Sequence, residues 1–202
     1  MIPSDFPSRI RRLYAAVEVM REFELTKFPA KIFPDKKRLI MCQDFSGGLT
    51  QAEMENYAGA ILENIGAFEY HLQQWASHNG KSSNRVSKVF RDSYDICLIH
   101  DLWNSDKHPG QSRSSRSCKN PKLVEVGRQM QLQTQAKEGS CVAMTLGKYG
   151  TPVVSGDGSA VAIITGDIVD LVGSVIADFA ETVDRALVEI EGLMSEFDIS
   201  LT

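Results

Sequence analysis

The chain has 202 residues, 43% of them hydrophobic, and a formal net charge of −4 at pH 7. A chain of this length and composition can bury the core of one domain, and we predict a single domain over residues 1–202. The acidic balance excludes a uniformly basic nucleic-acid coat protein, but it is compatible with a local basic patch.

The sequence carries no mark of secretion or of membrane insertion. Residues 1–5 have neither the basic flank nor the apolar run of a signal peptide. Every apolar stretch is too short to span a bilayer. The four cysteines form no CxxC pair, and we expect them to be reduced thiols. The sequence therefore predicts a cytoplasmic protein that does not associate with a membrane.

Four amphipathic segments are predicted to form helices. The first, at about residues 7–25, begins near Pro7, whose fixed φ suits the first turn of a helix. The second, at about residues 50–78, opens with a capping box, in which Thr50 and Glu53 each satisfy an unpaired backbone donor. Both segments repeat apolar residues at helical spacing, so each is expected to bury one face.

The second helix contains two glycines, Gly59 and Gly66, which we expect to let a neighbouring helix approach closely. The third helix, at about residues 83–108, is apolar over a wide arc and is expected to be central. The fourth, at about residues 167–196, begins with Asp167 as the predicted N-cap.

Short runs of β-branched residues lie between the third and fourth predicted helices, at about residues 122–165. Residues 152–154 and 160–164 flank an Asp-Gly turn and are predicted to form a hairpin. A further short strand is predicted at residues 38–41. The predicted fold is α+β, a four-helix bundle with a small antiparallel β-meander inserted between helices 3 and 4.

The end of the third predicted helix gathers side chains that could carry chemistry. His100, Asn104 and His108 lie at positions i, i+4 and i+8, so they share one face of the helix. The helix dipole at this C-terminus favours the protonated form of His108. Three charged residues lie among them: Asp101, Asp106 and Lys107.

This arrangement resembles the HEPN superfamily, helical bundles of which many are metal-independent endoribonucleases or nucleotide-binding proteins. The HEPN motif is an arginine followed four to six residues later by a histidine, often with a polar residue after the arginine, near the end of the third helix. Asn104 and His108 match the second half of this motif. Trp103 occupies the arginine position, and tryptophan cannot present a cationic fork to a phosphate.

The resemblance implies that His108 acts as general acid or base on a ribose hydroxyl or a leaving oxygen, while Asn104 orients the substrate or the histidine. Alternatively, both side chains bond the last carbonyls of the helix. The basic segment after this helix could meet phosphates, or it could be a solvated, flexible loop. Its candidate contacts to nucleic acid are Lys107, Arg113, Arg116 and Lys119.

No metal site and no cofactor are predicted. His100 and His108 lie two helical turns apart, whereas a zinc-binding histidine pair on a helix lies one turn apart. Asn104, between them, is a poor metal ligand. We therefore expect any chemistry at this helix to be independent of metal.

Three functions are compatible with the sequence. The first is a HEPN-like protein that binds RNA or a nucleotide, with lost or weak catalysis. The second is a non-catalytic interaction or structural module that forms a homodimer, because the apolar faces of the helices exceed what one bundle buries. The third is an active metal-independent endoribonuclease. The tryptophan at position 103 favours the first over the third.

Overall fold

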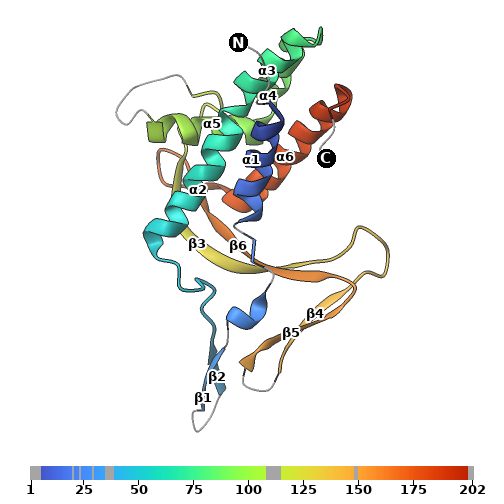
Figure 1. Cartoon of the computed structure of the whole chain (residues 1–202). Helices are drawn as coiled ribbons and strands as arrows, with labels where there is room; N and C mark the ends of the chain where they lie inside the picture. The colour runs from blue at the N-terminus through green and yellow to red at the C-terminus, as the bar shows by residue number, and fades with distance from the viewer. Residues whose placement is uncertain are drawn as a thin grey trace.

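Figure 1 shows the chain as a computed structural model, which describes residues 6–19, 21–22, 24–28, 30–34, 39–107, 115–147 and 150–199. For residues 32–34, 39–42 and 106 it describes the backbone alone. The helices of the described residues are α1 (Phe6–Glu18), α2 (Gln51–Gly66), α3 (Phe68–His78), α4 (Ser83–Asp92), α5 (Tyr94–Lys107) and α6 (Phe179–Glu196), with a short 3-10 helix, η1 (Leu25–Lys27). The strands are β1 (Lys31–Pro34), β2 (Leu39–Cys42), β3 (Lys122–Gln133), β4 (Val142–Leu146), β5 (Pro152–Gly156), β6 (Ser159–Val169) and β7 (Val175–Asp178).

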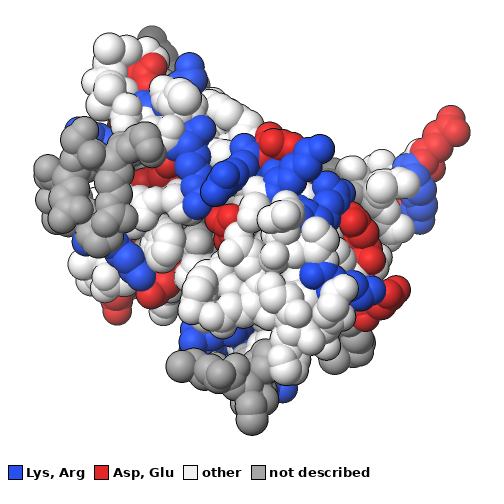
Figure 2. Space-filling view, turned by 90° about the horizontal axis from the view of Figure 1, so that it is seen from above, with Lys and Arg blue, Asp and Glu red and all other residues white. Residues whose placement is uncertain are grey.

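The helices form a layer on one side of a three-stranded antiparallel sheet of order β3-β6-β7 (Figure 1). Two further hairpins, β1-β2 and β4-β5, extend from the lower side in this view. Figure 2, which looks onto the helical layer from above, shows Lys and Arg side chains gathered in a band across that face. The charge on this face is therefore uneven, although the chain as a whole is acidic.

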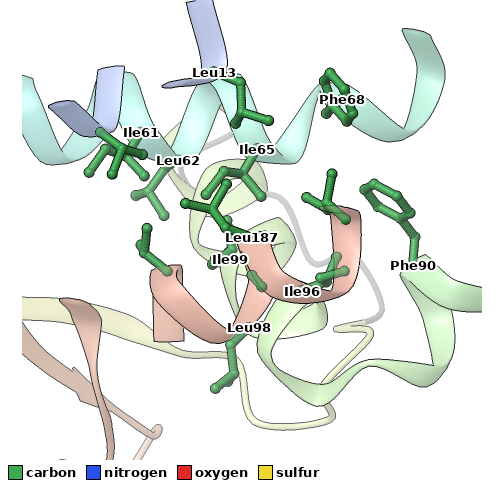
Figure 3. Close-up of a cluster of buried hydrophobic side chains, with 14 of the residues drawn as sticks. Leu13, Ile61, Leu62, Ile65, Phe68, Phe90, Ile96, Leu98, Ile99 and Leu187 are labelled. Carbon is green, nitrogen blue, oxygen red and sulfur yellow. The ribbon is translucent and has the colours of Figure 1, made fainter. Parts of the chain in front are cut away.

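The main hydrophobic core lies between the helices and the sheet. Every helix from α1 to α6 contributes buried side chains to it, and β6 adds Ile164 and Ile168. Figure 3 shows Leu13, Ile65 and Phe68 pointing toward the side chains of α5 and α6. Burying an aliphatic or aromatic side chain of this size stabilises the fold by roughly 1.5–3 kcal/mol, so this cluster holds the helical layer on the sheet.

Two of the long predicted helices are interrupted. The second breaks at Ala67 into α2 and α3, and the third breaks at Ser93 into α4 and α5. The Ser93 hydroxyl accepts a hydrogen bond from the Ile96 backbone N–H at 3.3 Å, so it caps the start of α5. It also donates to Glu189 of α6 at 2.9 Å, which ties the break to the core. The predicted capping box of Thr50 and Glu53 is confirmed at the start of α2.

The fourth predicted helix begins at the wrong residue. The chain from Asp167 continues as strand β6 and then β7, and α6 starts only at Phe179, with Asp178 as its N-cap. The apolar, β-branched residues of this stretch fit a helical stripe and a strand equally well, and the pairing of β6 with β3 and of β7 with β6 decides for strands.

The predicted hairpin between residues 152–154 and 160–164 is also wrong. β5 pairs with β4, and β6 pairs with β3. The turn between β5 and β6 is held instead by Asp157, whose carboxylate accepts the Cys141 backbone N–H at 2.9 Å. The short strand predicted at residues 38–41 is found as β2.

The α+β class is confirmed, whereas the finer architecture differs from the prediction. The described residues contain six α-helices instead of four, and α4 follows α3 with no strand between them. The strands form no simple meander, because β3 pairs with β6 across the intervening β4-β5 hairpin. None of the described helices combines the length and the apolar character needed to cross a membrane.

The two glycines of α2 have different surroundings. A Cβ atom at Gly66 would lie 2.7 Å from Cδ2 of Trp103, so only glycine lets α5 bring the indole this close. A Cβ atom at Gly59 would meet nothing within 4 Å. The expected close helix approach is therefore confirmed at Gly66 and wrong at Gly59.

Gly66→Ala should lower the free energy of unfolding by about 1–3 kcal/mol, because the indole has to move to make room for the methyl group. Gly59→Ala is the matched control in the same helix, and it should raise stability by about 0.5–1 kcal/mol through helix propensity alone. Urea denaturation followed by circular dichroism measures both. Equal stability of the two variants would contradict the close contact between Gly66 and Trp103.

Candidate functional site

A pocket of about 440 Å³ opens at the break between α2 and α3. Its wall combines residues from four helices, α2 to α5, with the segment that precedes β3. Cationic, titratable and aromatic side chains share this wall: Glu69, His71, Arg91, His100, Trp103 and Arg116.

The buried carboxylate of Asp101 holds the segment at residues 115–117 against α5. Asp101 is only 5% exposed, yet it accepts hydrogen bonds from the backbone N–H groups of Arg116 (2.9 Å) and Ser117 (2.8 Å). The hydroxyls of Ser115 (2.6 Å) and Ser117 (2.7 Å) donate to it as well. Burial raises the pKa of Asp101, but hydrogen bonds from His100, Ser115 and Ser117 outweigh it and hold the pKa well below the usual aspartate value.

Arg116 is directed into the pocket by this turn. Its Nη1 donates to the Glu69 carboxylate of α3 at 2.7 Å. Glu69 is only 7% exposed and also accepts from Gln73 at 2.9 Å, so its charge is compensated on both sides. A buried carboxylate needs such partners, because an unpaired charge in the interior is costly. The pair therefore joins α3 to the segment after α5.

His100 lies between two polar neighbours on its own helix. Its Nδ1 is 3.7 Å from Oδ1 of Asp101 and 3.0 Å from the amide nitrogen of Asn104. The Asn104 amide can donate a hydrogen bond to a ring nitrogen that carries no proton. His100 also lines the pocket, so its ring can contact a ligand.

Trp103 lines the pocket, but its ring is also held by packing contacts. Its ring lies on Gly66, and the Lys107 ammonium lies 4.6 Å from the ring centroid. Its Nε1 atom is buried, with no hydrogen-bond partner within the described part of the chain. The position at which a HEPN protein carries its arginine is thus filled by a side chain that is held between α2 and Lys107.

The predicted site residues are only partly brought together. Asn104 contacts His100 rather than the pocket, and Lys107 is 3.5 Å from the Glu63 carboxylate. Arg116 lines the pocket, while Lys119 is exposed and outside its wall. His108 and Arg113 lie outside the described residues.

Sequence reasoning missed three charged or titratable residues of the wall, Glu69, His71 and Arg91, as well as Tyr70 and Gln73. They come from α3 and α4, far along the chain from the motif at the end of α5. The signal in the sequence was Arg91, a basic residue in the last turn of an amphipathic helix, and such a residue does not identify a pocket.

The chain was also compared with known proteins. No family model, no curated protein and no solved structure matches it. The resemblance to HEPN proteins therefore depends on Asn104 and His108 alone. Within the described residues, no three His, Cys, Asp or Glu side chains are arranged to hold a metal ion.

Asp101→Asn should lower the free energy of unfolding at pH 7 by about 2–3 kcal/mol, because the amide cannot accept all four hydrogen bonds and one of its own donors faces donors. A carboxyl group with a depressed folded pKa stabilises the fold above its unfolded pKa, near 3.9, and this stabilisation is lost as the pH falls toward the folded pKa. The difference between wild type and variant should thus shrink below about pH 4.

Urea denaturation at pH 7 and at pH 3 measures this difference. Asp198→Asn is the control, because it removes a carboxylate whose side chain is 88% exposed in its pair with Lys81, and we expect it to have little effect. A gap between wild type and Asp101→Asn that stays constant with pH would show that the charge of Asp101 does not hold the turn.

Proposed function

We propose that this protein binds a phosphate-bearing ligand, RNA or a nucleotide, in the pocket between α3, α4 and α5, with lost or weak catalysis. The observation that carries the proposal is the convergence of Arg91, Arg116, His71 and His100 on one concave site. Guanidinium and imidazole groups are the usual protein partners of phosphate. A pocket of about 440 Å³ is in the range that holds small ligands.

The two arginines differ in what they offer a ligand. Arg116 shares its Nη1 with Glu69, so its remaining N–H groups are available to a phosphate while its position is fixed. Arg91 is exposed and has no ion-pair partner among the described residues. Its charge is therefore uncompensated, and it should supply most of the electrostatic attraction.

An aromatic platform lies beside these charges. Tyr70 is 61% exposed, and its ring meets His71 edge-on at a centroid distance of 5.5 Å. Exposed aromatic rings next to cationic groups are typical of sites that stack nucleobases. The combination favours a ligand with both a base and a phosphate over a simple anion.

Weak or lost catalysis fits the surroundings of Trp103. Phosphoryl transfer needs a cation placed at the scissile phosphate. The position where a HEPN protein carries its arginine holds Trp103 instead, whose ring packs on Gly66. The HEPN resemblance at Asn104 and His108 remains part of the proposal, with His108 as the candidate acid or base if any cleavage occurs. The third candidate function, an active endoribonuclease, is separated from the first by testing for cleavage.

Arg91→Ala should weaken the binding of a labelled single-stranded RNA and reduce the steepness of its salt dependence, because each phosphate contact on a single strand contributes a slope of about 0.7 in log K against log salt. Fluorescence anisotropy at several salt concentrations measures both quantities. Since Arg91 is exposed, the variant should fold normally.

Lys137→Ala is the control for a general loss of positive charge, because Lys137 lies in the loop between β3 and β4 and pairs with Asp157 at 2.8 Å. Equal effects of the two substitutions, or no salt-dependent binding at micromolar protein, would remove the proposal. Incubating the same RNA with the protein in EDTA and separating the products on a gel tests catalysis. If the RNA is cleaved and His108→Ala abolishes the cleavage, the function is nuclease activity and not binding alone.

A homodimeric interaction module is favoured by a separate observation. The turn between β6 and β7 and the first residue of β7 expose three apolar side chains, Leu171 (68%), Val172 (84%) and Val175 (61%). The turn is ordered, since Asp170 accepts the backbone N–H groups of Val172 (3.0 Å) and Ser174 (2.9 Å). Exposed apolar clusters on an ordered turn commonly mark contact surfaces.

If a second copy covers this turn, the wild type should sediment as a dimer at tens of micromolar and dissociate on dilution, whereas Val172→Asp should be monomeric at the same concentration. Val153→Asp provides the control, because Val153 is 47% exposed on β5, in the separate β4-β5 hairpin. A wild type that is monomeric at every concentration would eliminate the dimer.

A further inference from the structure

A second pocket, of about 280 Å³, adjoins the first across the break between α2 and α3. The two pockets share Ala67 and His71 in their walls. Ala67 is the residue at the break itself, and its small side chain leaves little to separate the two hollows. The two pockets therefore lie side by side, with Ala67 and His71 between them.

The second pocket is also cationic. Arg9 and Arg12 of α1 line it, and Arg12 is exposed with no ion-pair partner in the part of the chain that the structure describes. The acid in its wall, Glu63, faces the Lys107 ammonium at 3.5 Å, so its charge is compensated from α5. Each pocket thus carries two arginines and one acid: Glu69 of the first pocket pairs with Arg116 of the same wall, whereas Glu63 of the second pairs with Lys107 from outside its wall.

We infer that the ligand is a single-stranded RNA whose successive phosphates occupy both pockets, with Arg12 in the second phosphate subsite. This inference rests on the proposed function, and it specifies the substrate class as an oligonucleotide strand instead of a mononucleotide. His71, at the shared wall, lies where the strand passes from one pocket to the other. Arg12 and Arg91, whose charges have no ion-pair partner among the described residues, provide the attraction that draws a polyanion to these pockets.

The test compares two probes, adenosine 5′-monophosphate and a single-stranded RNA hexamer, on the full chain. The hexamer should bind more tightly than the mononucleotide. Arg12→Ala should weaken hexamer binding about fivefold at 0.1 M salt, the counterion-release contribution of one phosphate on a single strand, and should leave mononucleotide binding unchanged. Arg91→Ala should weaken both probes.

Arg11→Ala is the matched control, because Arg11 is an exposed arginine on the same helix, bonded to Ser8 at 3.2 Å and outside the wall of either pocket. It should bind both probes like the wild type. The second subsite would be overturned if the two probes bound with equal affinity, or if Arg12→Ala did not weaken hexamer binding. In either case, mononucleotide binding that depends on Arg91 would still support the first pocket. If neither probe binds, the proposed function fails and this inference fails with it.

Discussion

The buried carboxylate of Asp101 is the constraint on which the candidate site depends. A charge that is 5% exposed is tolerated only when donors surround it, and the chain supplies them from residues 115–117. Fixing this turn sets the position of Arg116, which in turn compensates the second buried carboxylate, Glu69. Residues 115–117 therefore supply hydrogen-bond donors to both buried carboxylates. This links α5, the turn and α3 into a unit whose parts cannot shift independently.

The groove follows from a second constraint, the contact between Gly66 and Trp103. Because the indole occupies the space that a side chain at position 66 would need, α2 and α5 approach closely at this point. The helix ends one residue later, and α3 begins after Ala67. Glycine at the end of α2 weakens the continuous helix, so the break and the close packing have the same cause. Both pockets open at this break, so packing deep in the core determines where a ligand can enter.

The features predictable from the sequence were those that a short stretch of chain determines. The capping box of Thr50 and Glu53 is local and is found where the sequence indicated, whereas the first predicted helix ends at Glu18 instead of about residue 25 and the fourth starts at Phe179 instead of Asp167. The breaks at Ala67 and Ser93 are not visible in periodicity, because the apolar stripe continues through them. Residues 167–178 show the opposite problem: an apolar, β-branched run fits both a helix and a strand. Pairing of β6 with distant β3, and of β7 with β6, decides for the strand. The pocket needs Arg91, Arg116 and Glu69 from three separate segments, and no spacing rule connects them.

The distribution of acids explains how an acidic protein acquires a basic groove. The C-terminal segment places Glu196 on Arg85 of α4 at 2.8 Å and Asp198 on Lys81 at 3.1 Å. Asp184 of α6 likewise pairs with Arg21, at the sheet side of the helical layer. These acids neutralise the basic residues that lie near α6 and do not extend to Arg91 or Arg12, which keep their charges without an acidic partner among the described residues. A net charge of −4 therefore does not argue against a polyanionic ligand. The electrostatic potential at the two pockets depends on the arginines that have no acidic partner, and not on the net charge of the chain.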